Sequence, residues 1–177
     1  MPHTGLAQGK LRRFSLGEAL EGEFVSVCLV RDVQNSKDLL RILMEKSHPL
    51  LVNLTKCPSA QSVILMNAKM IYSLEHILVS VSTCLLRRKF QSKMKTRAFE
   101  TEVIYNMSPS TNISASLRAF GLTDTTKDIV CLFVNIDDVD AIGEFLGLVQ
   151  GQVDILDHIS SVNEVSEIAK CSPFDSN

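Results

Sequence analysis

Two stretches of the chain have the apolar pattern of buried strands. Residues 24–31, "FVSVCLVR", are rich in valine and alternate enough to predict a strand with at least one buried face. Residues 128–136, "DIVCLFVNI", are almost continuously apolar, as strands with both faces covered usually are. Both stretches are therefore predicted to belong to the core of the fold.

Between these strands, apolar residues first recur at helical spacing. The helix predicted over residues 35–46 has an N-cap at Asn35 or Ser36, where a side-chain oxygen accepts a free backbone N–H. Its apolar stripe consists of Leu39, Leu40, Leu43 and Met44. Residues 50–54, "LLVNL", form a candidate short strand.

A second helix is predicted after the turn "KCPSAQ" at residues 56–61. Ser59 is its expected cap. Its apolar face would run through Val63, Ile64, Ala68 and Ile71.

The stretch "IYSLEHILVSVSTCLLRR", residues 71–88, fits either a helix or a strand. Apolar residues at intervals of three and four favour a helix, whereas the β-branched centre also suits a strand. A helix that continues to Lys89 would place three cations at its negative end, where each is stabilising by about 0.3–1 kcal/mol. We therefore predict a helix. A membrane span needs about 20 apolar residues, and Glu75 and His76 interrupt this run.

The remaining pattern alternates strand and helix. Residues 101–107, "TEVIYNM", predict a strand with Glu100 and Glu102 on one face, and "SPSTN" predicts a turn. The helix that follows is expected to be capped by Asn112 and closed by a left-handed Gly121. Two further helices are predicted, over residues 137–148 and over "SSVNEVSEIAK", the latter with an apolar face of Ile159, Val162, Val165 and Ile168.

This order of elements predicts an α/β fold, with helices covering a mixed sheet of about four to five strands. The 177 residues suit a single domain, which we place at residues 24–170. Residues 1–23 are expected to form a partly flexible N-terminal segment and residues 171–177 a tail. The first residues have no apolar h-region of a secretory signal, so an intracellular protein is expected.

The residue types that usually carry catalysis or bind metals are poorly arranged for either role. The five cysteines are widely spaced and form no CxxC pair, which favours free core thiols over disulfides or a metal site. The four histidines include no i, i+4 pair. No G-x-G-x-x-G, P-loop or G-x-S-x-G motif occurs. We predict no catalytic residue, no cofactor and no metal.

Charge is strongly segregated along the chain, although the net charge is only −2. Six of the 18 cations lie within residues 87–97, which contain no acidic residue: Arg87, Arg88, Lys89, Lys93, Lys95 and Arg97. Between Asp124 and Glu167, ten carboxylates accompany one cation, Lys127. A cationic cluster of this kind gains affinity for phosphate by releasing counterions, although a solvated surface explains it equally well from composition alone.

Taken together, several segments resemble one known family. The longest, "KMKTRAFETEVIYNMSPSTNISASLRAFGL", begins at Lys93. It is accompanied in the same order by "VCLVRDVQNSKDLLRILMEK", "ILMNAKMIY", "DIVCLFVNI" and "VNEVSEIAK". These segments resemble the kinase-binding small subunit of the KEOPS (EKC) complex, the TPRKB family, and it is their collinear order that carries the resemblance.

The resemblance implies a non-catalytic regulatory subunit, in the cytoplasm and nucleus, with no membrane partner. Such a subunit binds the atypical kinase/ATPase of the complex, and through it the other subunits. It also engages the 3′ end of tRNA and supports threonylcarbamoyladenosine modification of tRNA. The candidate tRNA contacts are Lys93, Lys95, Arg97, Asn106, Ser108 and Asn112. The kinase is expected on the helix at residues 35–46, through Leu39, Leu40 and Leu43.

Two parts of the chain depart from the family as matched here. Residues 74–90 have no matched counterpart, so they are expected to be an insertion, either folded as a helix or looped out, and Arg87 to Lys89 would not share the family's role. The family also has a further C-terminal helix where this sequence reads "SPFDSN". Two alternative functions remain open: a small-molecule or acyl-transfer enzyme with a site at the Asn106–Asn112 turn, and a stand-alone RNA-binding module.

Overall fold

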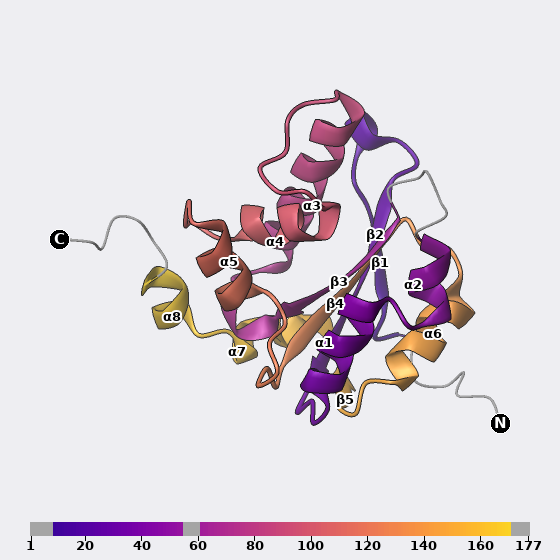
Figure 1. Cartoon of the computed structure of the whole chain (residues 1–177), viewed down its shortest axis with the longest axis vertical. Helices are drawn as coiled ribbons and strands as arrows, with labels where there is room; N and C mark the ends of the chain where they lie inside the picture. Colours follow the sequence, from indigo (N-terminus) through magenta and orange to yellow (C-terminus); the bar gives the residue numbers. More distant parts are fainter. Residues whose placement is uncertain (1–8, 55–60, 171–177) are drawn as a thin grey trace.

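A single five-stranded sheet forms the middle of the protein, in a computed structural model that describes residues 9–54 and 61–170 (Figure 1). Its strands are β1 (Arg12–Ser15), β2 (Phe24–Arg31), β3 (Ser62–Asn67), β4 (Ile129–Val134) and β5 (Gln152–Asp154). The order along the sheet is β1-β2-β4-β3, and β5 pairs with the end of β2. The pairings of these strands are all antiparallel. The α/β class and the strand number are therefore confirmed, whereas the sheet is antiparallel and not mixed.

Side chains on the two faces of the sheet bury two separate apolar clusters. Because neighbouring residues of a strand point to opposite faces, Val25, Val27 and Leu29 of β2 enter one cluster, whereas Cys28 and Val30 enter the other. All six residues of β4 are buried. The near-continuous apolar pattern of these two strands reflects helices on both faces, and both predicted strands are confirmed.

One face of the sheet is covered by α1 (Ser36–Glu45), α2 (Pro49–Leu54) and α6 (Val139–Gly147) (Figure 1). The helices predicted at α1 and α6 are confirmed, but α2 replaces the strand predicted over residues 50–54. Pro49 suits the start of a helix, because the N–H that it lacks would have no partner there. Leu50 and Leu51 then pack into the core beneath α2.

The side chain of Asn35 joins α1 to the end of α6. Its amide donates to the carbonyl of Leu148 at 2.8 Å and accepts from the N–H of Gln150 at 3.0 Å. It does not cap α1, so the predicted role of Asn35 as a side-chain cap is wrong. Asp138, by contrast, does cap α6, because its side chain accepts from the N–H of Ala141 at 2.9 Å.

The other face of the sheet is covered by the remaining helices (Figure 1). These are α3 (Leu74–Lys89), α4 (Phe99–Met107), α5 (Ile113–Phe120), α7 (Ile159–Val162) and α8 (Val165–Lys170). Three short 3₁₀ helices also occur: η1 (Glu18–Leu20), η2 (Ala68–Met70) and η3 (Leu156–His158).

The helix α3 resolves the choice between helix and strand for residues 71–88. It begins after Ser73, whose hydroxyl accepts from the N–H of His76 at 3.3 Å, and it ends at Lys89 with its three cations in the last turn. Four of its residues are buried in the core cluster: Ile77, Val81, Cys84 and Leu85. The stretch at residues 74–90 is therefore folded into the domain and is not looped out. That it is an insertion relative to the family stays a prediction.

The segment predicted as a strand at residues 101–107 is instead the helix α4. Its buried apolar residues include Phe99, Val103 and Met107, which recur every four positions and so share one helix face. The alternation seen in the sequence starts only after Phe99, and the helical pattern is visible only when that residue is included. Glu100 and Glu102 lie in the first turn, where the helix dipole favours carboxylates.

The predicted second helix is wrong as well, because residues 62–67 form β3 and only η2 follows it. Val63, Ile64, Leu65 and Met66 are all buried. Such an unbroken run fits a strand between two helical layers, which buries both of its faces. The predicted turn at residues 56–61 and its cap, Ser59, lie almost wholly outside the described residues.

Two helix ends differ in detail from the sequence prediction. Gly121 ends α5 as expected, but its φ of −78° is not left-handed. A Cβ at this position would lie 2.5 Å from the carbonyl oxygen of Leu117, so glycine is required by a close approach. The last predicted helix is divided into α7 and α8 at Asn163, whose amide donates to the carbonyls of Ile71 and Tyr72 at 3.3 and 3.0 Å.

Three cysteines, Cys28, Cys84 and Cys131, are buried free thiols, as predicted. Cys57 and Cys171 lie outside the described residues. In the part of the chain that the structure describes, no helix has the length and apolar character needed to cross a bilayer. Nor does this part contain a group of three or more side chains suited to hold a metal ion.

Candidate nucleic-acid interface

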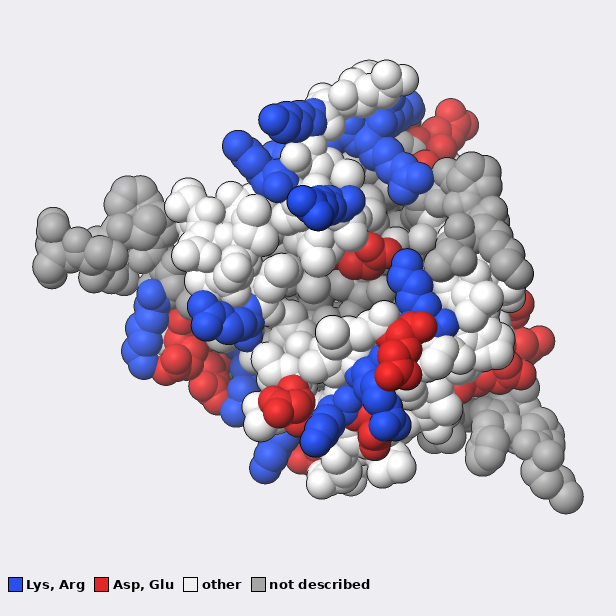
Figure 2. Space-filling view, viewed as in Figure 1, with Lys and Arg blue, Asp and Glu red and all other residues white. Residues whose placement is uncertain are grey.

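The segment between α3 and α4, residues 91–98, carries three exposed cations and is here named the basic loop. Lys93, Lys95 and Arg97 are exposed, whereas Met94 and Thr96 between them are half-buried. Within residues 9–54 and 61–170, the side chains of the three cations form no hydrogen bond or ion pair. Figure 2 shows Lys and Arg side chains gathered over this end of the molecule. Their charge is therefore presented to solvent.

The basic loop starts at a sharp helix end. Gln91 has a left-handed φ of 51°, and the N–H of Ser92 donates to the carbonyl of Arg87 at 2.7 Å. A left-handed residue followed by this longer backbone hydrogen bond is a common way to close a helix. It turns the chain away from the axis of α3 and into the loop.

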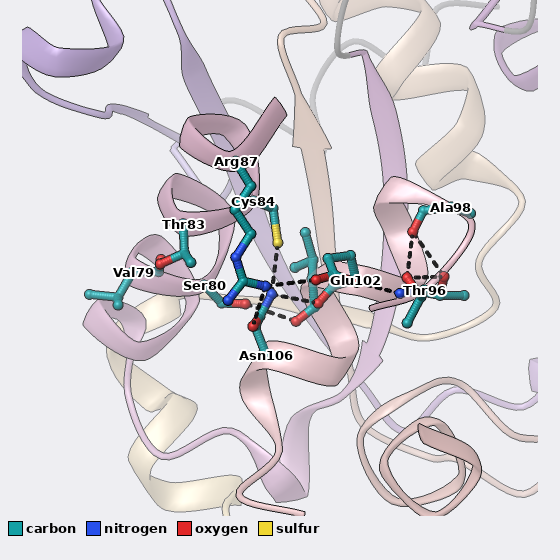
Figure 3. Close-up of polar contacts among 11 residues, drawn as sticks. Val79, Ser80, Thr83, Cys84, Arg87, Thr96, Ala98, Glu102 and Asn106 are labelled. Carbon is teal, nitrogen blue, oxygen red and sulfur yellow. Dashed lines mark hydrogen bonds and ion pairs between the residues drawn. The ribbon is translucent and has the colours of Figure 1, made fainter. Parts of the chain in front are cut away.

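The cations of α3 itself are used differently. The guanidinium of Arg87 points toward α4, where its Nη1 donates to Glu102 Oε1 at 2.7 Å and to Asn106 Oδ1 at 3.3 Å (Figure 3). Lys89 Nζ donates to the carbonyl of Ala19 at 2.9 Å. These two cations therefore hold elements of the fold together. The charge of Arg87 is offset by Glu102, whereas Lys89 stays exposed.

Glu102 is the centre of this network and is fully buried, with 0% of its side chain exposed. One carboxylate oxygen accepts from Arg87, and the other accepts from the N–H of Thr96 in the basic loop at 2.7 Å (Figure 3). Burial alone would raise the pKa of Glu102. The hydrogen bonds from the backbone N–H groups of Thr96 and Lys95 and from the side chain of Arg87 outweigh it and hold the pKa below its usual range. The group is therefore an ionised carboxylate at neutral pH.

The end of the basic loop is fixed by two threonines. Thr96 Oγ1 donates to the carbonyl of Ala98 at 3.0 Å, and Thr101 Oγ1 donates to the same carbonyl at 2.9 Å. The two hydroxyls are themselves 3.0 Å apart. These contacts join the loop to the first turn of α4, so both ends of the loop are anchored.

The other candidate tRNA contacts are mostly engaged in local structure. Asn106 donates to the carbonyl of Glu102 at 2.9 Å and to Cys84 Sγ at 3.1 Å, besides accepting from Arg87. Ser108 Oγ accepts from the N–H of Ser110 at 3.1 Å. Asn112 caps α5, as predicted, by accepting from the N–H of Ala115 at 3.0 Å.

The structure does not bring all six candidate tRNA contacts to one place. The basic loop precedes α4, and the turn that holds Ser108 and Asn112 follows it. A helix rises 1.5 Å per residue, so the nine residues of α4 separate the two by about 13 Å. The turn therefore lies at the opposite end of α4 from the basic loop.

The candidate kinase contacts also differ from one another. Leu39 is 0% exposed and packs under α1 in the core. Leu40 and Leu43 are half-buried and line an open groove of about 560 Å³, with Met44 at its rim. The groove runs between the α1–α2 pair and the α4–α5 pair, over β3, and its apolar lining includes Leu54, Val63, Ile104 and Leu117. The sequence pattern did not predict this groove, because three of the elements that line it were predicted wrongly: α2 and α4 as strands and β3 as a helix.

Comparison with known proteins identifies the family of the chain. A family model described as "Kinase binding protein CGI-121" matches residues 30–172. Among curated relatives, "EKC/KEOPS complex subunit TPRKB" of Danio rerio is 30% identical over 107 residues, which cover 60% of this chain and 61% of the relative. "EKC/KEOPS complex subunit cgi121" of Aspergillus fumigatus is 28% identical over 112 residues, which cover 63% of this chain and 53% of the relative.

The matched stretch spans between about half and three fifths of the length of these two relatives. The match to the family model is broader, and its range includes α1, the whole of α3, the basic loop and α4. Since it covers well over half of the chain, the protein belongs to the CGI-121 family of kinase-binding proteins.

Proposed function

We propose that this chain is a non-catalytic subunit of an EKC/KEOPS complex. In this role it binds the atypical kinase/ATPase of the complex and tRNA, and it supports threonylcarbamoyladenosine modification of tRNA in the cytoplasm and nucleus. The observation that carries the proposal is the family match over residues 30–172, together with relatives that are named as subunits of this complex.

The basic loop supports the tRNA part of the proposal. Phosphate contacts made by lysine and arginine supply affinity without reading sequence, and that is what a subunit acting on many tRNAs needs. Lys93, Lys95 and Arg97 are exposed on one loop whose two ends are anchored. The Ser108–Asn112 turn is at the other end of α4 and would meet a different part of the same RNA.

The groove supports the kinase part of the proposal. Protein-binding surfaces usually have an apolar centre with a polar rim. Leu40 and Leu43 provide such a centre on α1, with the exposed Met44 beside them. Leu39 is excluded from direct contact, because a residue with no exposed surface reaches a partner only if the core opens. Leu39 instead supports α1 from below.

The experiment is a pull-down with the purified KEOPS kinase and two matched variants. Met44 is 77% exposed and Val79, on the outer side of α3, is 64% exposed, so a glutamate at either position leaves the core intact. We expect capture of the wild-type chain, a loss of about tenfold or more in affinity for Met44→Glu, because a charge would be buried in the interface, and no change for Val79→Glu. Failure to capture the wild-type chain would contradict kinase binding. Equal losses in both variants would place the kinase elsewhere.

A stand-alone RNA-binding module remains the second candidate, because the basic loop would serve it as well. Measuring tRNA affinity with and without the kinase separates the two. A complex subunit is expected to bind tRNA more tightly when the kinase is present, since linked binding sites raise the effective concentration of each other's ligand. Affinity that is the same in both conditions would favour the module acting alone.

A further inference from the structure

We propose that Glu102 is the positioning residue of the basic loop. Its buried carboxylate holds the loop backbone in place, so that Lys93, Lys95 and Arg97 form a preordered cationic surface before any RNA arrives. The part that concerns RNA rests on the proposed function, whereas the part that concerns the order of the loop does not.

The carboxylate of Glu102 joins three segments of the chain. Glu102 itself belongs to α4, its Oε1 accepts from Arg87 of α3 at 2.7 Å, and its Oε2 accepts from the N–H of Thr96 in the loop at 2.7 Å. Hydrogen bonds to an ionised acceptor are roughly twice as strong as neutral ones. No water competes for these two bonds, because the side chain has no exposed surface.

Holding Thr96 inward determines where the cations point. Residues 93–97 alternate in exposure, with Met94 and Thr96 half-buried and the three cations exposed. Residues 95–98 form a bend, in which the backbone N–H groups of Lys95 and Thr96 both face the carboxylate of Glu102. Anchoring the backbone of the bend at the buried carboxylate leaves the side chains of Lys95 and Arg97 exposed, as that of Lys93 is. The exposure of the Lys-x-Lys-x-Arg pattern therefore depends on the hydrogen bonds between the loop backbone and Glu102.

Arg87 offsets the negative charge that Glu102 brings close to the loop cations. A negative charge directly beneath three cations would weaken their attraction for phosphate. Arg87 forms an ion pair with Glu102 from the α3 side, so the two charges offset each other while both hydrogen bonds to the loop and to α3 are retained. Arg87 therefore acts through Glu102 and is not itself proposed as a phosphate contact.

A preordered loop binds more tightly than a mobile one, because the entropy of ordering does not have to be lost when RNA binds. Losing the anchor is expected to lower affinity without changing the number of phosphate contacts, since all three cations remain. The slope of log affinity against log salt reports that number. A positioning residue and a contact residue therefore give different results in the same measurement.

The test uses two variants of Glu102 and one control. Glutamine has one acceptor oxygen and one donor group, so Glu102→Gln cannot satisfy both Thr96 and Arg87. The double variant Arg87→Met with Glu102→Leu replaces the pair by apolar groups, a change that is often neutral for folding, and it also removes the anchor. The control is Glu100→Gln, on the same turn of α4, whose carboxylate accepts from Ser62 Oγ at 2.7 Å and does not touch the loop.

The first measurement is limited digestion of the full chain by trypsin, which cleaves after lysine and arginine, with mass spectrometry of the products. We expect cleavage after Lys93, Lys95 and Arg97 to be at least about tenfold faster in both Glu102 variants. The other sites should stay as protected as in the wild-type chain, and Glu100→Gln should match the wild type. Unchanged cleavage of the loop in both Glu102 variants would overturn the proposal.

The second measurement is the affinity for a tRNA transcript at several salt concentrations. We expect both Glu102 variants to bind about three- to tenfold more weakly with an unchanged salt slope. An opened loop with wild-type affinity would overturn the role of Glu102 in RNA binding. A wild-type chain that does not bind tRNA would overturn the proposed function, while faster cleavage in the variants would still support the role of Glu102 in ordering the loop.

Discussion

Two groups of cations within residues 87–97 lie only a few residues apart, yet they have different roles in the fold. Arg87 and Lys89, at the end of α3, donate to acceptors of the protein itself, namely Glu102 and the carbonyl of Ala19. Lys93, Lys95 and Arg97, in the basic loop, point to solvent. The comparison shows that a dense run of charge in a sequence is not the same as a dense patch on a surface.

The difference arises from the secondary structure on either side of Gln91. On α3, residues three or four positions apart share one side, and Ser80, Cys84 and Arg87 all make hydrogen bonds to α4. In the loop, exposed and half-buried residues alternate from Lys93 to Arg97, and residues 95–98 form a bend that is anchored at Glu102. The helical period therefore turns Arg87 toward the fold, whereas the anchored bend leaves the second group exposed to solvent.

The largest effect in this comparison is expected when one cation is removed from each group. Arg87→Ala leaves the buried Glu102 without its cation. Because Arg87 is itself 33% exposed, we expect a loss of about 2 kcal/mol in the free energy of unfolding, below the value for a fully buried pair. Lys93→Ala should change it by less than about 0.5 kcal/mol. Urea denaturation measures both, and equal losses would contradict the division into two groups.

For RNA binding, removing the loop cations is expected to have the larger effect and removing a cation of α3 the smaller one. Changing Lys93, Lys95 and Arg97 together to alanine should weaken tRNA binding by about tenfold at low salt and lower the salt slope by about 2, because about 0.7 of a counterion is released per phosphate contact on a single strand. Lys89→Ala, in the first group, should leave the slope unchanged. Filter binding at several salt concentrations measures the affinity and the slope. A slope that the triple change does not alter would mean that the loop cations are ordinary solvated side chains and do not contact phosphate.

A smaller effect is expected from pH on the stability that Glu102 contributes. The pKa of Glu102 is lowered in the folded protein, so the ion pair and its hydrogen bonds stabilise the fold above the carboxyl's unfolded pKa of about 4.3 and lose this contribution as pH falls through the folded value. The stability difference between wild type and Glu102→Gln should therefore be largest near pH 7 and shrink below about pH 4. A Lys93→Ala difference measured alongside should stay small throughout. A Glu102→Gln difference that grows in acid would have the wrong sign.

The smallest effect is expected at the boundary between the two groups. Gln91 has a φ of 51°, a region that side chains other than glycine adopt at a cost. Glycine at this position removes that cost but adds freedom to the unfolded chain, so we expect Gln91→Gly to stabilise the protein by about 0.5 kcal/mol. Thermal unfolding measures it, with Gln34→Gly, at an exposed position outside the helices, as the control. A loss of stability larger than in the control would mean that the helix end is not strained.

Sequence patterns correctly predicted the elements in which apolar spacing and end signals together favoured one type of structure. The strands β2 and β4 and the helices α1, α3, α5 and α6 are of this kind. The helix α4 was missed because its apolar face begins at Phe99, outside the alternating stretch, and β3 was missed because four consecutive apolar residues fit a helix and a buried strand equally well.

The exposed cations of the loop could be recognised from their residue types, but the burial of other site residues could not. Leu39 and Leu43 belong to one apolar stripe in the sequence, and only the position of the sheet decides that Leu39 is fully covered. Glu102 has no local signal at all, because its partners are Arg87, fifteen positions earlier, and the backbone of Thr96. The burial of Leu39 and that of Glu102 both depend on packing between segments that are distant in the sequence.

Two buried thiols at the middle of the sheet allow the rate of its opening to be measured. Cys28 of β2 lies directly opposite Cys131 of β4, and neither has exposed surface. Burial raises the pKa of Cys28 to about 12 and raises that of Cys131 well above its usual value, so at neutral pH almost no reactive thiolate exists while the sheet is closed. The rate of alkylation at each of these two thiols therefore reports how often β2 and β4 separate.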